Sequence, residues 1–234
     1  MLGAKMDNNL ETLIELKTQL SKHLESGDTD HNLILELSHK IAAFEKDKVR
    51  FTVDAGVIDR LGQELVARQE TAVSELVKNA YDADATIVSL TFKDSDDLGG
   101  TLIIEDDGDG MSRDELVNGF MRISSTSKIH NPLSRKYKRQ RAGQKGIGRF
   151  SVQRLGLDLS IITQTSSSDE ALQLNINWSE YQQDSNLLTI SNQLVRIKKV
   201  KDKGTILVIN GLRDKWSKAA IQRVYRYVSN IIQP

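Results

Sequence analysis

Three polar side chains recur at helical spacing in the stretch AVSELVKNAYDADAT, residues 72–86. Glu75, Asn79 and Asp82 occupy positions i, i+4 and i+7, so a helix would place all three on one face. An apolar stripe runs beside that face, where carboxylate and carboxamide oxygens can hold a metal ion or a water molecule. A solvated helix face is the ordinary alternative. Asp84 lies just beyond the row, and we expect it to cap the helix or to face solvent.

The segment EDDGDGM, residues 105–111, carries acidic side chains at the end of a predicted strand. Gly108 and Gly110 can adopt conformations closed to other residues and would let a flat ligand approach the backbone. An EF-hand calcium loop is excluded, because Met111 stands where a ligand belongs and Asn118 where the bidentate glutamate belongs. A simple acidic turn remains the alternative.

Two later segments carry further signals. GQKGIGRF, residues 143–150, is a glycine-rich turn entering a helix, and free N–H groups at a helix start favour phosphate oxygens. KGTILVING, residues 203–211, brings Thr205 onto a late strand. A P-loop is excluded because the chain lacks G-x-x-x-x-G-K-[ST]. A Rossmann site is excluded because the glycine turn follows a basic loop and not an early strand.

Helical and strand periodicities follow one another in a clear order. Two helices separated by a turn are predicted within residues 6–48, and Ser112 with Glu115 forms a capping box that opens a short helix. The predicted strands are 86–94, 100–108, 157–164, 171–178, 187–190, 194–199 and 204–210, and helices are predicted at 149–156 and 216–232. This order predicts an α+β sandwich, with helices on one face of a mixed, mostly antiparallel sheet and an N-terminal helical hairpin.

Composition excludes several classes of protein. A chain of 234 residues can form one sizeable core with an appendage, and its 32 basic and 32 acidic residues give no global field that selects nucleic acid or an anionic membrane. Locally, residues 94–109 are acidic and residues 135–149 are basic. Cysteine, a long apolar run and a secretory signal are all missing from the sequence, so we expect a cytoplasmic protein with no membrane segment.

Taken in order, these segments resemble the boxes of the GHKL ATPase superfamily, named for gyrase, the ninety-kilodalton heat-shock chaperone, sensor histidine kinases and MutL. ELVKNAYDADAT is similar to the E-x-x-x-N box in its MutL and chaperone form. DDGDGM is similar to D-x-G-x-G, GQKGIG to G-x-x-G-x-G, and GTILVINGL to the late G-T strand. RISSTSK is similar to the segment that opens the ATP lid in MutL-like members. The resemblance runs from about Phe51 to the end of the chain and implies the Bergerat fold, a two-layer sandwich that binds ATP.

The resemblance also implies how the base of ATP would be read. Asp106 would accept a hydrogen bond from the exocyclic amine of adenine, and Thr205 would help through an ordered water. Met111 and Ile147 would form apolar walls for the ring, although ordinary core packing is an equally good interpretation of both.

For the phosphate end, the resemblance implies that Asn79 is the ligand of Mg²⁺ and that Glu75 is the general base that orients a water toward the γ-phosphate. Asp82 would support the metal or nucleotide waters. The residues implied to contact nucleotide phosphates are Ser127, Lys128, Gly143, Lys145, Gly146 and Gly148.

The expected function is slow, Mg²⁺-dependent ATP hydrolysis that acts as a conformational and dimerisation switch in a larger protein. We expect a helical extension at 1–48 and an ATP-binding domain at 49–234 with a lid at about 123–146. MutL-like and gyrase-like members continue into a second domain whose lysine reaches the γ-phosphate, so a downstream domain is expected to be missing from this chain. The partners implied are ATP or ADP, a second copy of the chain, and an effector domain or partner protein.

Three alternatives stay open. A histidine kinase would use His39 as phosphoacceptor, although the DADA continuation and the late G-T strand argue against this class. A nucleotide-binding interaction module would bind ATP without turnover. Nucleic acid could bind the basic loop, but we expect its side chains to be solvated; they are Arg135, Lys136, Lys138, Arg139 and Arg141. The biological setting, mismatch repair or prokaryotic antiviral defence among others, does not follow from the fold.

Overall fold

The computed structural model describes residues 2–27, 30–45, 51–65, 68–123, 132–142 and 150–231. Two compact units divide the chain: Met1–Gly56 with Gln182–Ser191, and Val57–Tyr181 with Asn192–Pro234. The domain boundary expected between residues 48 and 49 falls among residues 46–50, which lie outside the described residues. Among the helices in the described ranges, none is both long and apolar enough to cross a membrane.

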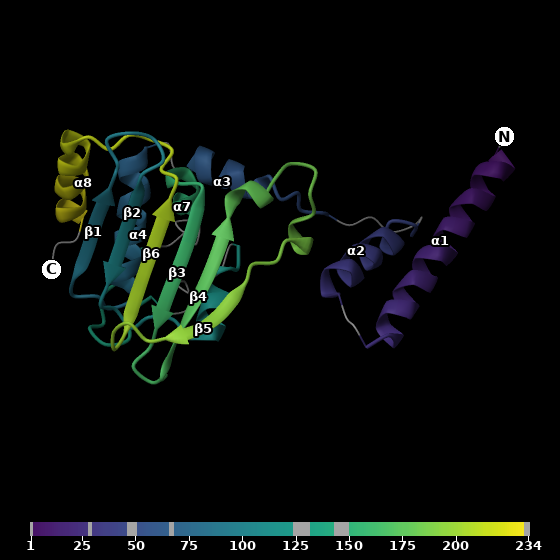
Figure 1. Ribbon diagram of the computed structural model, residues 1–234, viewed down its shortest axis with the longest axis horizontal. Coiled ribbons are helices and arrows are strands. Elements are labelled where there is room, and N and C mark those ends of the chain that lie inside the picture. Colours follow the sequence, from purple (N-terminus) through teal and green to yellow (C-terminus); the bar gives the residue numbers. More distant parts are fainter. Residues whose placement is uncertain are drawn as a thin grey trace. The chain divides into compact units, whose positions relative to one another are not determined.

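The first unit is built on two helices, α1 (Leu2–Glu25) and α2 (His31–Ala42), which pack against each other (Figure 1). The Asp30 carboxylate begins α2 by accepting hydrogen bonds from the amides of Asn32 and Leu33. The two predicted helices are therefore confirmed. The strand predicted at 187–190 is wrong, because this segment forms the 3-10 turn η4 (Leu187–Thr189), capped by the side chain of Asn186.

The second unit contains a six-stranded sheet in the order β1-β2-β6-β3-β4-β5. Each of the pairings between these described strands is antiparallel. The strands are β1 (Val88–Lys93), β2 (Thr101–Asp106), β3 (Asp158–Gln164), β4 (Glu170–Asn177), β5 (Leu194–Lys198) and β6 (Gly204–Asn210). Apart from the segment 187–190, which forms η4, every predicted strand is present within a residue or two of its predicted bounds.

Helices α3, α4 and α7 lie behind the sheet in the view of Figure 1, and α4 contacts both α7 and α8. Their bounds are α3 (Val57–Leu65), α4 (Gln69–Asp82), α7 (Ser151–Leu155) and α8 (Lys218–Ile231). The predicted capping box is confirmed: Ser112 and Glu115 bond reciprocally at the start of α5 (Arg113–Glu115), and the π-helical turn η1 (Leu116–Phe120) continues it. A 3-10 turn, η3 (Trp178–Glu180), follows β4.

The core lies between the sheet and α4. Alternate strand residues face it, and so does the apolar stripe of the helix. The buried members are Leu102, Ile104, Leu159, Ile161 and Ile209 on the strands and Val73, Leu76, Val77 and Ala80 on α4. The predicted α+β sandwich is confirmed.

Polar residues continue this buried row at one end of the inner strands β2, β6 and β3, which we call the lower edge of the sheet. Asp106 follows Leu102 and Ile104 on β2, while Thr163 follows Leu159 and Ile161 on β3, and both are buried. β2 and β3 end, and β6 begins, at the lower edge of the sheet in Figure 1. Polar groups placed at the end of a hydrophobic core need partners, so this edge is where a site would form.

Candidate functional site

Asp106 is the buried carboxylate of this edge, with 9% of its surface exposed. Its Oδ1 accepts hydrogen bonds from the amide of Gly108 at 2.9 Å and from the amide of Thr205 at 3.2 Å. Burial raises the pKa of Asp106 above its ordinary value, because the two amides and the charge of Lys201 only partly offset the loss of water. The two hydrogen bonds therefore orient a carboxylate that is largely shielded from solvent.

The turn after Asp106 depends on its glycines. Gly110 has φ +69°, and a Cβ added there would lie 2.0 Å from the carbonyl oxygen of Gln164. A Cβ added at Gly108 would lie 2.8 Å from the carbonyl oxygen of Ala83, at the C-terminal end of α4. The amide of Asp109 donates to that same carbonyl at 2.8 Å. The acidic turn is thus packed directly against the end of the helix that carries the polar row.

Thr163 joins the turn to β6, and sequence reasoning missed it. Its hydroxyl accepts the amide of Met111 at 2.8 Å and lies 3.2 Å from the hydroxyl of Thr205. The register that pairs Thr163 with Thr205 creates this contact. A lone threonine in a strand gives no signal in the sequence, so only the strand pairing could have identified it.

Two lysines that are distant in the sequence, Lys201 and Lys203, bond to the acidic turn. Lys201 donates to the backbone carbonyl of Asp106 at 2.5 Å and to the carboxylate of Glu105 at 3.0 Å. Lys203 donates to Asp109 at 2.8 Å, and this hydrogen bond raises the pKa of Lys203. The acidic turn is therefore charge-balanced by the segment that leads into β6.

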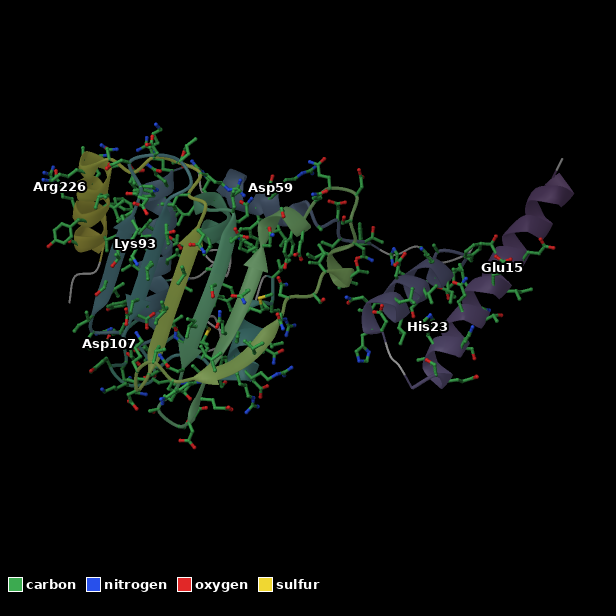
Figure 2. All side chains as sticks on the ribbon, viewed as in Figure 1. Glu15, His23, Asp59, Lys93, Asp107 and Arg226 are labelled. Carbon is green, nitrogen blue, oxygen red and sulfur yellow. The ribbon has the colours of Figure 1, made fainter. Side chains whose placement is uncertain are left out.

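The neighbouring Asp107 has a structural role. Its carboxylate accepts the amides of Thr86 at 2.6 Å and Ile87 at 2.8 Å, and it also bonds the Thr86 hydroxyl. Although burial opposes ionisation, these bonds hold the pKa of Asp107 below its ordinary value. Figure 2 shows Asp107 at the lower end of the sheet, beside β1 and β2. It ties the chain leaving α4 to the acidic turn.

The row Glu75, Asn79 and Asp82 lies on α4 as predicted. Glu75 and Asn79 are half-buried, and Asp82 is buried with 5% of its surface exposed. Lys78 donates to the Glu75 carboxylate at 2.7 Å, and Asp82 accepts the amide of Ala142 at 2.8 Å. The row is therefore the edge of a buried face and not a solvated surface.

Asp84 differs from its expected position. It is buried, with 2% of its surface exposed, and it accepts hydrogen bonds from residues 134–137. The expectation that it caps the helix or faces solvent is wrong, because the chain turns at Asp84 with φ +62° and directs the carboxylate inward. Arg139 also departs from the expected solvated loop: it donates to the carbonyl of Ala85 at 2.6 Å and stacks over the ring of Tyr81.

Several predicted site residues lie outside the described residues, and the structure does not place them. They are Ser127, Lys128, Gly143, Lys145, Gly146, Ile147 and Gly148. Of the remaining set, the structure brings Asp106, Gly108, Gly110, Met111 and Thr205 together, whereas Glu75, Asn79 and Asp82 share one face of α4. The Asp106 carboxylate accepts the amides of Gly108 and Thr205, Gly110 and Met111 extend the same turn, and the end of α4 packs on it.

The arrangement offers a buried acceptor for a hydrogen-bond donor and, on α4, oxygen ligands for a hard cation. Within the described ranges, no group of three or more His, Asp or Glu residues could enclose a metal ion. The Asn79 carboxamide beside the buried Asp82 fits an ion that keeps most of its waters and takes few protein ligands, as Mg²⁺ does when it binds with phosphates.

Comparison with curated proteins gives several MutL relatives, each described as a DNA mismatch repair protein, and three of them illustrate the match. The protein of Halobacterium salinarum is 39% identical over 85 residues, which is 36% of this chain and 12% of the relative. That of Methanocorpusculum labreanum is 44% identical over 70 residues, 30% of this chain and 12% of the relative. That of Chlorobium chlorochromatii is 46% identical over 67 residues, 28% of this chain and 10% of the relative. The chain thus matches only about a tenth of the length of these relatives.

A family model gives the broader match. The model for histidine kinase-, DNA gyrase B- and HSP90-like ATPases matches residues 67–205, a range that runs from the start of α4 to Thr205 and includes the acidic turn. The match covers more than half of the chain and contains the side chains of the site described above, from Glu75 to Thr205. The chain therefore belongs to the family of histidine kinase-, DNA gyrase B- and HSP90-like ATPases.

Proposed function

We propose that this chain binds ATP and hydrolyses it slowly with Mg²⁺, as the nucleotide switch of a larger protein. The observation that carries the proposal is the Asp106 carboxylate, which is buried, is oriented by two backbone amides and begins the turn that packs against the end of α4. Family membership supports the same conclusion. Glu75 and Asn79 lie on that helix, where the reacting phosphate would need a base and a metal ligand.

Adenine selectivity follows from the hydrogen-bonding state of Asp106. Both amides bond to Oδ1, so Oδ2 is the oxygen that the exocyclic amine of adenine would approach. Guanine carries a carbonyl at that position and would place one acceptor against another. A buried polar group left unpaired is costly, so the site should reject GTP.

Hydrolysis would depend on positioning more than on proton removal, because the transition state of phosphoryl transfer is loose. Glu75 would orient the attacking water, and its ion pair with Lys78 holds the carboxylate on the helix edge. Asn79, supported by Asp82, would hold Mg²⁺, which when bound neutralises charge on the phosphate oxygens. The phosphate contacts inferred from the sequence at Ser127, Lys128, Gly143, Lys145, Gly146 and Gly148 complete the proposed site.

Calorimetric titration with ATP, ADP and GTP, with and without Mg²⁺, tests the binding part of the proposal. We expect heat of binding with ATP and ADP, a gain in ATP affinity with Mg²⁺, and no binding of GTP. Equal affinity for ATP and GTP would contradict the role of Asp106. Incubation with γ-labelled ATP separates the reaction classes: released phosphate supports hydrolysis, whereas an acid-labile label lost in His39→Ala would indicate phosphotransfer.

We further propose that ATP binding promotes dimerisation and that the larger protein acts in a DNA-related process. The relatives described as DNA mismatch repair proteins support this setting, although the match covers only a small part of each. Light-scattering mass measurement with a non-hydrolysable ATP analogue is the test. A mass that stays the same with saturating analogue would contradict the dimerisation switch.

A further inference from the structure

Residues 132–142 form a short hairpin that is separate from the main sheet. Leu133 and Gln140 form an antiparallel bridge. The amide of Ser134 donates to the carbonyl of Arg139 at 2.9 Å, and the amide of Arg141 donates to that of Pro132 at 2.8 Å. Lys138 turns the chain with φ +55°. The segment therefore has a defined backbone of its own.

Asp84 is the centre of its attachment to the rest of the unit. The carboxylate accepts the hydroxyl of Ser134 at 2.6 Å, the amide of Lys136 at 2.6 Å and the amide of Tyr137 at 3.2 Å. Burial opposes the charge of Asp84, but these bonds and the positive charge of Arg139 hold its pKa below the ordinary value. One side chain thus satisfies three donors of the hairpin.

Further contacts hold the hairpin on the same short stretch. At the C-terminal end of the hairpin, the amide of Ala142 donates to the Asp82 carboxylate. The Arg139 guanidinium lies 4.6 Å from the ring centroid of Tyr81 and 4.7 Å from that of Tyr137. The hairpin is therefore attached along its length to residues 81–85, immediately after the helix turn that carries Asn79.

The hairpin is also a concentration of positive charge. Within residues 132–142 there are basic side chains and no acidic one. Arg135 pairs with Glu115 of α5, while Lys136 and Lys138 are exposed. A fixed positive segment next to a site for a polyphosphate raises the affinity for the anion, and salt weakens this effect.

We propose that Asp84 is a positioning residue that holds the basic hairpin beside the phosphate end of the nucleotide site and so strengthens ATP binding. This inference rests on the proposed function, because it assigns the hairpin a role at the same site. Asp84 acts on binding and not on the attacking water. Its loss therefore raises Kd and KM for ATP and leaves kcat unchanged.

Asp84→Gly is the sharpest test. Glycine accepts the left-handed backbone of this position without strain, so the substitution removes the carboxylate and keeps the turn. Ser134→Ala, which removes one of the three donors, is a milder second variant. Asp107→Asn is the matched control for hydrogen exchange, because Asp107 makes the same kind of bonds to Thr86 and Ile87 and makes none of those given above to the hairpin.

Hydrogen exchange in the absence of nucleotide measures how firmly the hairpin is attached to Asp84. We expect protection of the Lys136 and Tyr137 amides to fall at least about tenfold in Asp84→Gly, with a smaller loss in Ser134→Ala. Asp107→Asn should instead lower protection at Thr86 and Ile87. Unchanged protection at residues 136 and 137 in Asp84→Gly would overturn the assignment of Asp84.

Titration and steady-state kinetics with ATP measure the effect of the hairpin on Kd, KM and kcat. In Asp84→Gly we expect Kd and KM to rise about three- to tenfold at low salt, kcat to stay within about twofold, and the difference from wild type to shrink at high salt. Equal Kd in a variant whose hairpin amides have lost protection would overturn the proposal. A wild type that binds no ATP would refute the proposed function, and hydrogen exchange would still decide whether Asp84 holds the hairpin.

Discussion

Replacing Asp106 by Asn tests the adenine assignment while leaving the fold nearly intact. Asn keeps an Oδ1 that can accept the amides of Gly108 and Thr205, but it presents an NH₂ group where the adenine amine would approach. The variant loses a hydrogen bond to a charged acceptor, which contributes about 1.5–3 kcal/mol. ATP affinity should therefore fall about ten- to one-hundredfold.

Stability should change little in this variant. Burial raises the pKa of Asp106, so the ionised side chain is poorly solvated, and a neutral Asn removes that penalty while weakening two hydrogen bonds. The two effects oppose each other, and we expect a shift in Tm of only a few degrees.

Calorimetric titration with ATP and thermal unfolding measure the two quantities separately. Glu105→Gln is the matched control, because it removes a carboxylate one residue away whose exposed ion pair with Lys201 contributes little. We expect the control to bind ATP as wild type does. An Asp106→Asn variant that stays folded and binds ATP with wild-type affinity would refute the reasoning.

Three further outcomes follow from the site. Glu75→Gln should keep ATP affinity within about twofold and lower kcat about one-hundredfold or more, as rapid-mixing phosphate release would show; an undiminished kcat would remove Glu75 from the reaction. Gly110→Ala should lower the free energy of unfolding by about 3 kcal/mol or more, because its Cβ would lie 2.0 Å from a carbonyl oxygen. Gly99→Ala is the control: Gly99 also has a positive φ but has open space around it, so we expect a loss of only about 1 kcal/mol. Chemical denaturation measures both losses, and similar values would contradict the close approach at Gly110. On acidification, ATP affinity should decline at a pH above 3.8 as Asp106 takes up a proton, because burial raises the pKa of Asp106. The amides bonded to Asp84 should stay protected over the same range, because the pKa of Asp84 is lowered. ATP titrations across pH with Asp106→Asn as control test this, and the same decline in both proteins would mean that another group is responsible.

Local periodicity predicted much of this fold. The i, i+4, i+7 row places Glu75, Asn79 and Asp82 on one edge of α4, and the capping box of Ser112 with Glu115 forms as expected. These features depend on residues that are close in sequence, so the pattern alone contains the geometry. The position of Asp106 at a strand end was predictable for the same reason.

Long-range pairing decided what could not be predicted. Thr163 becomes part of the site through its register with Thr205, and neither residue specifies that register alone. Asp84 becomes a buried hydrogen-bond centre only because residues 134–137 return to it from fifty positions away. The segment 187–190 looked like a strand from its apolar run, but the Asn186 cap favours a helical turn there.

The first compact unit has a consequence for any attempt to divide this protein. Because residues 182–191 belong with Met1–Gly56, that unit is assembled from two stretches of chain that lie far apart in the sequence. The backbone bonds joining Ala55 to Ser185 and Leu187 to Val53 hold them together. Cutting the polypeptide before residue 51 would remove the two helices and keep the bonds of Val53 and Ala55 to residues 182–191. Cutting after Gly56 would leave residues 182–191 without these partners.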